Sequence, residues 1–319
     1  MKTILNKLFY IMMMLFIIAV ISFLAIHIAP NIFLATGELN PNITKESIEH
    51  LKKIYGLDKS LTQQFFSWIW ALIHLDFGIS FASGKAVLDE IGSRIGITLT
   101  INIISMVLVF FISIWLGVKS ALKEDGKLDK ISKQFALISF AMPSFYLALL
   151  LIMIFSVSFG WFPISGLHSI EPKSGLSYYT DEAWHFILPI FVMVFGGIGS
   201  LMMYIRGLTV EILKSDYIFF AKARKVSENQ ILKKYILPNL YPPIVTMLGL
   251  SLPGLIGGSV ILETIFSING MGLLFFQSAM SRDYPVIMGI LIISAFLTLL
   301  GNIIADLVLM RLNPFFNRA

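Results

Sequence analysis

The chain has 319 residues, of which 57% are hydrophobic and 13% charged, with a net charge of +5 and no cysteine. Soluble domains carry about 25% charged residues, so this composition excludes an ordinary soluble domain and predicts an all-α integral membrane protein. The missing cysteine excludes disulfides, a thiol nucleophile and a thiolate metal site. The positive charge lies between apolar stretches, which membrane orientation explains better than nucleic-acid binding.

Six apolar stretches are long enough to cross a bilayer, which takes about 20 residues each. They are 9–28, 97–118, 134–157, 185–205, 240–264 and 286–310. The first stretch resembles a signal peptide, but its apolar core is too long and no clear cleavage site follows, so we expect a retained anchor. Of the 24 Lys and Arg residues, 16 lie at the termini and in 119–133 and 206–239. This bias predicts that both termini are cytoplasmic.

The segments 29–96, 158–184 and 265–285 are therefore expected outside the cytoplasm. In the first of them, Thr44 is placed to cap a helix that ends before Gly56. An aromatic cluster follows that is typical of a membrane interface, formed by Phe65, Phe66, Trp68 and Trp70. We expect residues 1–96 to form an anchor helix with an extracytoplasmic segment, and residues 97–319 to form a five-helix core.

The segment 206–239 is predicted to form a cytoplasmic loop of two short helices joined by a turn. Ser227, followed three residues later by Gln230, fits a capping box that opens the second helix. Ile231, Tyr235 and Ile236 then recur at helical spacing. The pattern leaves two interpretations open: a solvated basic loop that sets membrane orientation, or a docking element for a partner.

The fifth apolar stretch is rich in residues that break or closely approach helices: Gly249, Pro253, Gly254, Gly257 and Gly258. The Gly254-x-x-x-Gly258 spacing is typical of close helix packing. Broken backbone inside a membrane needs packed protein or a water-filled path to satisfy it. A gated pathway and a static packing face both remain open.

Two ionisable residues lie inside apolar stretches, Glu263 in the fifth and Asp306 in the sixth. A proton relay and a helix-pairing role near the membrane boundary are the alternatives, and we favour the second because neither residue is near mid-span. No phosphate-binding Gly-x-x-x-x-Gly-Lys-Ser/Thr loop occurs in the sequence. The five histidines are scattered, so no catalytic residue, metal ligand or bound cofactor is predicted.

The loop 206–239 resembles the coupling motif of bacterial ABC importer permeases in three runs: Asp216-Tyr217, Ala221-Lys222-Ala223-Arg224 and Ile236-Leu237-Pro238-Asn239. Further runs resemble the dipeptide/oligopeptide/nickel branch of this family: Asp76-Phe77-Gly78-Ile79-Ser80, the stretch 257–272 and Arg282-Asp283-Tyr284-Pro285. Two departures stand out. Lys225 occupies a turn position where the family usually has Gly, and Pro30-Asn31-Ile32-Phe33 replaces the usual run after the first span.

The resemblance implies a type I ABC importer permease fold and an ATPase-coupling loop that includes Tyr217, Ala221, Ala223, Arg224, Lys225, Ser227, Ile236, Leu237 and Pro238. It also implies a second, related permease subunit, one or two ATPase subunits that bind ATP and Mg, and an extracytoplasmic solute-binding protein. If Lys225 is left-handed, its side chain costs about 1–2 kcal/mol, and a differently built turn is the alternative.

Substrate is a separate question. The run 68–89 looks closest to the nickel-import permease, so nickel, free or chelated, is expected, with di- or oligopeptides as the alternative. An ion-coupled secondary transporter is a distant third possibility, in which Glu263 and Asp306 would form the relay. It would require inverted repeats and mid-membrane charges, and the sequence shows neither.

Overall fold

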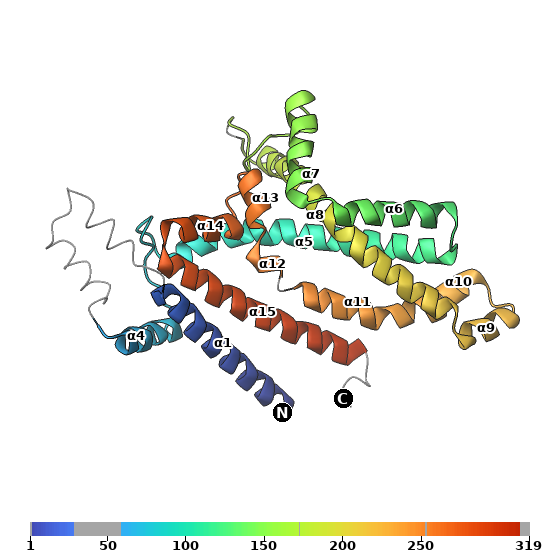
Figure 1. Ribbon diagram of the computed structural model, residues 1–319, viewed down its shortest axis with the longest axis horizontal. Helices are drawn as coiled ribbons and strands as arrows, with labels where there is room; N and C mark the ends of the chain where they lie inside the picture. Colours follow the sequence, from blue (N-terminus) through green and yellow to red (C-terminus); the bar gives the residue numbers. More distant parts are fainter. Residues whose placement is uncertain (1, 29–58, 172, 253, 313–319) are drawn as a thin grey trace. The chain divides into compact units, whose positions relative to one another are not determined.

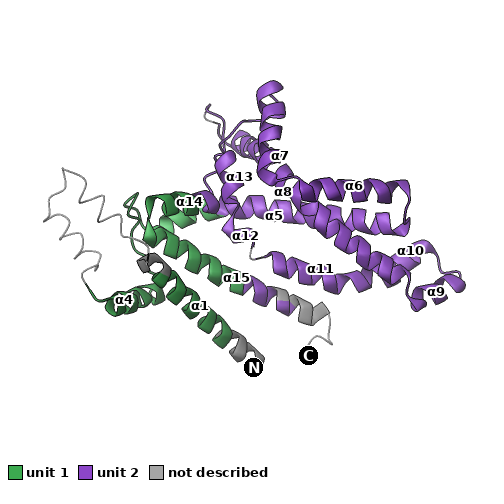
Figure 2. Cartoon of the chain, viewed as in Figure 1, with its two compact units in different colours: residues 1–95, 274–299 green, residues 96–273, 300–319 purple. Residues whose placement is uncertain are grey.

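The computed structural model describes residues 2–28, 59–171, 173–252 and 254–312. The expectations for Thr44, Gly56, Pro253 and the run 30–33 lie outside these residues. The chain divides into two compact units (Figure 2), one of residues 1–95 with 274–299 and the other of residues 96–273 with 300–319. Within the described residues the structure is helical, with an isolated β-bridge between Ile79 and Ala86.

The first unit contains α1 (Lys2–Ile28), α4 (Leu61–Ile73), the start of α5 (Val87–Leu122), most of α14 (Met271–Ser281) and the first part of α15 (Tyr284–Leu312). The helix α4 begins at Ser60, which forms a capping box with Gln63. Phe23 of α1 packs on Phe65 and Trp68, with ring centroids 5.2 and 5.9 Å away. Half of the predicted aromatic cluster thus packs on the anchor helix, while Phe66 and Trp70 are exposed.

Two of the recognised sequence runs meet inside this unit. Asp283 is buried and accepts hydrogen bonds from the Ser80 hydroxyl (2.5 Å) and from the backbone N–H groups of Phe81 (3.0 Å) and Ala82 (3.2 Å). A buried carboxylate needs such partners to offset its lost hydration. The loop after Gly78 is therefore fixed to the turn between α14 and α15.

The second unit contains the rest of α5, then α6 (Lys127–Ala141), α7 (Ser144–Leu151), the π-helical η1 (Ile152–Ser158) and α8 (Leu176–Leu213). It continues with α9 (Asp216–Ala223), α10 (Glu228–Ile231), the π-helical η2 (Leu232–Ile236), α11 (Leu237–Ser251), α12 (Gly254–Gly257) and α13 (Val260–Ile265) (Figure 1). Arg206 of α8 forms a two-bond ion pair with the fully buried Asp129 of α6, at 2.5 and 2.8 Å. This pair joins the cytoplasmic ends that we expect for α6 and α8.

All six predicted apolar stretches fall on helices. Among the described residues, four helices are long and apolar enough to cross a membrane: Val87–Leu122, Leu176–Leu213, Glu228–Gly257 and Tyr284–Ile304. A bent pair, Lys127–Ala141 with Ser144–Ser158, would make a fifth, and Phe9–Leu24 of α1 is a shorter apolar helix. The prediction of an all-helical membrane protein is confirmed.

Two predicted spans are not continuous helices. The span 134–157 bends by 97° between α6 and α7. Pro143 cannot donate a helical hydrogen bond and it forces the preceding Met142 into extended backbone (φ −83°, ψ 118°). The span 240–264 is divided into α11, α12 and α13, and Gly258 at the second break has φ +63°.

Candidate functional site

The segment between α8 and α11 is a compact helical hairpin rather than an open loop. Ile218 and Ala221 of α9 are buried against Ile231, Ile236 and Leu240, in a core shared with α5, α8 and α11. This core belongs to the second unit, so α9 and α10 are held on the ends of α8 and α11. A force applied to the hairpin would be passed to those two long helices.

The turn of the hairpin keeps the left-handed conformation despite the side chain of Lys225. Lys225 has φ +58°, its N–H donates to the Lys222 carbonyl (2.9 Å), and the Val226 N–H donates to the Ala221 carbonyl (3.1 Å). These two bonds form a Schellman motif, which normally ends in glycine. The alternative of a differently built turn is therefore wrong, and Lys225 carries a conformational cost of about 1–2 kcal/mol.

The second helix of the hairpin begins as predicted. The Ser227 hydroxyl accepts a hydrogen bond from the Gln230 N–H (3.4 Å), which caps the helix. Ile231 and Ile236 point inward and the two lysines between them are exposed. The turn Leu232–Ile236 is π-helical, just before Pro238, which cannot donate to the Lys234 carbonyl.

The exposed surface of the hairpin differs from the one the motif suggested. Ala221 is 4% exposed and supports α9 from inside, whereas Phe219 and Phe220 are 68% and 63% exposed. They lie beside the exposed Ala223 and Arg224, and we call these four residues the hairpin face. Adjacent exposed phenylalanines are typical of an interaction site. Neither phenylalanine was predicted as a site residue, although two consecutive phenylalanines in an otherwise basic loop are a detectable signal.

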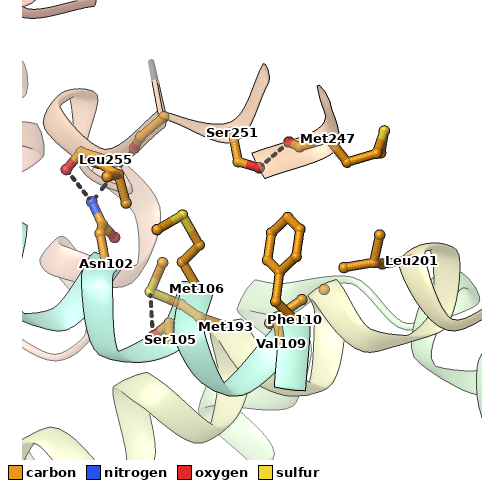
Figure 3. Close-up of a pocket in the computed structure, with 12 residues that line it drawn as sticks. Asn102, Ser105, Met106, Val109, Phe110, Met193, Leu201, Met247, Ser251 and Leu255 are labelled. Carbon is orange, nitrogen blue, oxygen red and sulfur yellow. Dashed lines mark hydrogen bonds between the residues drawn. The ribbon is translucent and has the colours of Figure 1, made fainter. Parts of the chain in front are cut away.

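The second unit also contains a cavity of about 300 Å³ (Figure 3). Twelve residues of α5, α8, α11 and α12 line it, and none of them is ionisable: Asn102, Ser105, Met106, Val109, Phe110, Met193, Gly197, Leu201, Met247, Ser251, Gly254 and Leu255. Of the five glycine and glutamate candidates in the described part of the fifth span, Gly254 lines this cavity and Gly249 is buried. The cavity is thus neutral, with a mixture of thioether, aliphatic and polar groups.

Three polar side chains of the cavity are held by bonds within the unit. The Asn102 amide donates to the Leu255 carbonyl (2.7 Å), which ties α5 to the broken part of the fifth span. The Ser105 hydroxyl donates to the Met193 sulfur (3.7 Å), and the Ser251 hydroxyl donates to the Met247 carbonyl (2.6 Å). Dashed lines in Figure 3 mark these contacts.

Glu263 lies in a cage of hydrogen bonds beyond the cavity. It is 6% exposed, and its two carboxylate oxygens accept from the Thr98 hydroxyl (3.1 Å) and the Leu273 N–H (2.8 Å). The Thr98 oxygen also accepts from the Met271 N–H (2.8 Å). Glu263 therefore joins α13 to α5 and to the start of α14, as a helix-pairing role requires.

Glycines make this cage possible. A β-carbon on Gly258 would collide with a Glu263 oxygen, and one on Gly270 would lie 2.6 Å from the other. A β-carbon on Gly272 would lie 2.8 Å from the Val260 nitrogen. Gly254 and Gly258 do not lie on one continuous helix, because α12 ends at Gly257 between them. The predicted close helix contact through Gly254-x-x-x-Gly258 stays a prediction.

Comparison with known proteins places these features in a family. Residues 111–318 match the model described as "Binding-protein-dependent transport system inner membrane component". Residues 1–102 match the model of the N-terminal part of such membrane components.

Several curated relatives match across almost their whole length. The chain is 36% identical over 298 residues to the oligopeptide transport system permease protein AppB of Bacillus subtilis, covering 93% of both chains. It is 33% identical over 302 residues to the glutathione transport system permease protein GsiC of Escherichia coli K12, covering 94% of both. A solved structure of the MetNI methionine ABC transporter, in inward-facing conformations, shares the fold with a TM-score of 0.55 at 19% identity, covering 70% of this chain and 96% of that one.

The type I importer permease fold expected from the sequence is thereby confirmed, as is a multi-pass inner-membrane protein. The chain belongs to the family of binding-protein-dependent transport system inner membrane components, the permease subunits of ABC importers.

Proposed function

We propose that this chain forms half of the translocation pathway of an ATP-driven importer for di- or oligopeptides. One observation carries the proposal: α8 and α11 both line the neutral cavity, and the same two helices carry the hairpin α9–α10 at their ends. A partner that moves the hairpin would therefore move two walls of the cavity.

The hairpin face is the proposed docking site for an ATPase subunit. Phe219 and Phe220 offer exposed apolar surface, and the small Ala223 beside them leaves room for a partner's groove. ATP, with Mg²⁺, would be bound and hydrolysed by one or two such subunits. Their closure would shift the equilibrium between outward-open and inward-open states only if the docked contacts differ in free energy between the two.

The remaining assembly follows from the family. We propose that a second, related permease completes the pathway, and that an extracytoplasmic solute-binding protein delivers the substrate. Both termini are proposed to be cytoplasmic, on the basis of the Lys and Arg distribution. Single cysteines introduced at each terminus should react with a membrane-impermeant thiol reagent only in inverted vesicles, since the chain has no cysteine of its own.

Peptide is favoured over nickel as the substrate. The relatives AppB and GsiC are named for oligopeptide and glutathione transport. The cavity lining contains no imidazole or carboxylate, and imidazole is the side chain that best suits Ni²⁺ in proteins. The nickel expectation, drawn from the run 68–89, has no support from these relatives.

The test is ATP-dependent uptake by the complete transporter in liposomes, with the chain, its partner permease, its ATPases and its binding protein. Uptake of labelled tripeptides, without competition from Ni²⁺, is the expected result. Accumulation of Ni²⁺ together with indifference to peptides would overturn the peptide assignment and restore the nickel alternative.

A further inference from the structure

The polar side chains of the cavity share one property: their hydrogen-bond donors are already bonded within the protein. Asn102, Ser105 and Ser251 each have hydrogen-bond donors, yet each donor is committed to an acceptor within the unit. The end of the Asn102 amide that faces the Leu255 carbonyl must be the NH₂ group, because a carbonyl only accepts. What these side chains can still offer to a ligand is their oxygens.

The cavity therefore presents acceptors and few donors. Within the described residues, the Asn102 Oδ1 has no hydrogen-bond donor, and the two serine oxygens keep lone pairs free after donating. Three thioethers, of Met106, Met193 and Met247, add only weak acceptors. These side chains lie around one space in Figure 3, on α5, α8 and α11.

We propose that the cavity contacts the transported peptide through the peptide's neutral backbone N–H groups, which donate to Asn102, Ser105 and Ser251. This inference rests on the proposed function. A ligand carboxylate has only acceptors, so it could pair with these side chains only by drawing a donor away from its present acceptor, which costs the bond already made. A ligand ammonium has donors, but the lining contains no ionisable residue to balance its charge.

The rest of the lining suits a peptide of variable sequence. Methionine is unbranched and polarizable, and it adapts to ligands of different shape. A volume of about 300 Å³ lies at the lower end of ligand pockets, about 300–1,000 Å³, so the cavity holds part of a peptide at a time. Backbone contacts with adaptable side-chain contacts give the weak, repeated binding that passage requires.

The experiment compares a tripeptide with its analogue methylated on the central backbone nitrogen, in wild-type and variant transporters. Losing one hydrogen bond should slow uptake of the methylated peptide by about fivefold relative to its parent. Methylation also alters recognition by the binding protein, but that effect is the same for every permease variant. The informative quantity is therefore the parent-to-methylated uptake ratio, and how it changes between variants.

The chain provides a matched control for Ser251. Thr246 lies on the same helix α11 and its hydroxyl donates to the carbonyl four residues earlier (2.9 Å), as that of Ser251 does, but it is exposed and outside the cavity. We expect S105A and S251A to lower the parent-to-methylated uptake ratio, because each removes an oxygen that would accept a hydrogen bond from the peptide N–H. We expect T246A to leave this ratio unchanged. If S251A, S105A and T246A all transport peptide with the same parent-to-methylated uptake ratio, the inference is overturned and the proposed function stands. If the wild-type transporter does not take up peptide at all, the proposed function itself is refuted.

Discussion

The cage around Glu263 makes a quantitative prediction for the substitution E263Q. In the native chain, each carboxylate oxygen accepts one hydrogen bond, from Thr98 and from Leu273. A glutamine of the same shape has one oxygen and one NH₂ group. If the NH₂ group faces Thr98, it can donate to the hydroxyl oxygen, but the Thr98 proton then loses the carboxylate as its acceptor. If the NH₂ group faces the Leu273 N–H, that donor is left unpaired. One charge-assisted hydrogen bond is lost, which costs about 1.5–3 kcal/mol.

This loss is large enough to measure. For a chain of 319 residues, an unfolding entropy of about 2.1 cal/mol/K per residue gives a melting-temperature shift of about 1.5 °C per kcal/mol, so E263Q should melt about 2–5 °C lower. The measurement is the temperature at which the detergent-purified transporter loses its monodisperse peak on fluorescence-detected size exclusion. Helix pairing through Glu263 explains the shift, since α13, α5 and the start of α14 all meet at this side chain.

A matched control separates the cage from a general effect of removing a glutamate. Glu211, on α8, is exposed, and surface substitutions change stability by about 0.5 kcal/mol or less. E211Q should therefore melt within about 1 °C of the native chain. If E263Q and E211Q have the same melting temperature, the Glu263 carboxylate does not hold these helices together. A role such as proton relay then becomes the explanation of why Glu263 is buried.

Three further predictions concern the hairpin and the fifth span. A223E should abolish ATP-dependent uptake while the chain stays in the membrane, because a charged side chain would enter the proposed ATPase contact; normal uptake with normal ATPase co-purification would disprove the docking assignment. K225G should slow hydrogen exchange of the Val226 N–H by about fivefold, since glycine relieves about 1 kcal/mol at φ +58°; faster exchange would show that the turn does not need the left-handed conformation. A cysteine at Gly254 should react with a water-soluble thiol reagent at a rate that changes with ATP, whereas one at the buried Gly249 should not react; protection of Gly254 in every nucleotide state would remove it from the pathway.

Local sequence signals predicted local structure well. Apolar stretches of about 20 residues located the long helices α1, α5, α8 and α15, and Ser227 with Gln230 located the start of α10. The shorter α4 and α14 lie outside those stretches. Pro143 and Gly258 lie where predicted spans break, whereas Pro189 lies inside the continuous α8 and Pro243 inside the continuous α11. The position of a proline therefore did not by itself predict a break, nor how sharp it would be. The 97° bend after α6 depends on the backbone of Met142 as well as on Pro143, and a single proline within a helix is compatible with a milder kink.

Pairings between distant residues were not predictable from one sequence. Thr98 and Glu263 are 165 positions apart, and Ser80 and Asp283 are 203 apart. The local sequence around each of these residues does not predict its hydrogen-bond partner, because the bond depends on how distant segments pack. The inward direction of Ala221 was missed for the same reason: small residues fit equally well under a helix or against a partner.

We propose that the two explanations of the glycine-rich fifth span, a pathway wall and a packing face, apply to different residues. Gly254 lies in the wall of the cavity, and a β-carbon there would meet no atom within 4 Å. Gly258 is locked against Glu263, together with Gly270 and Gly272, where any side chain would collide. The break at Gly258 lies between the two groups of residues: α12, which lines the cavity, ends before it, and the residues that pack around Glu263 follow it. Packing at Gly258 is therefore compatible with the gating role that we propose for Gly254, because the two glycines have different surroundings.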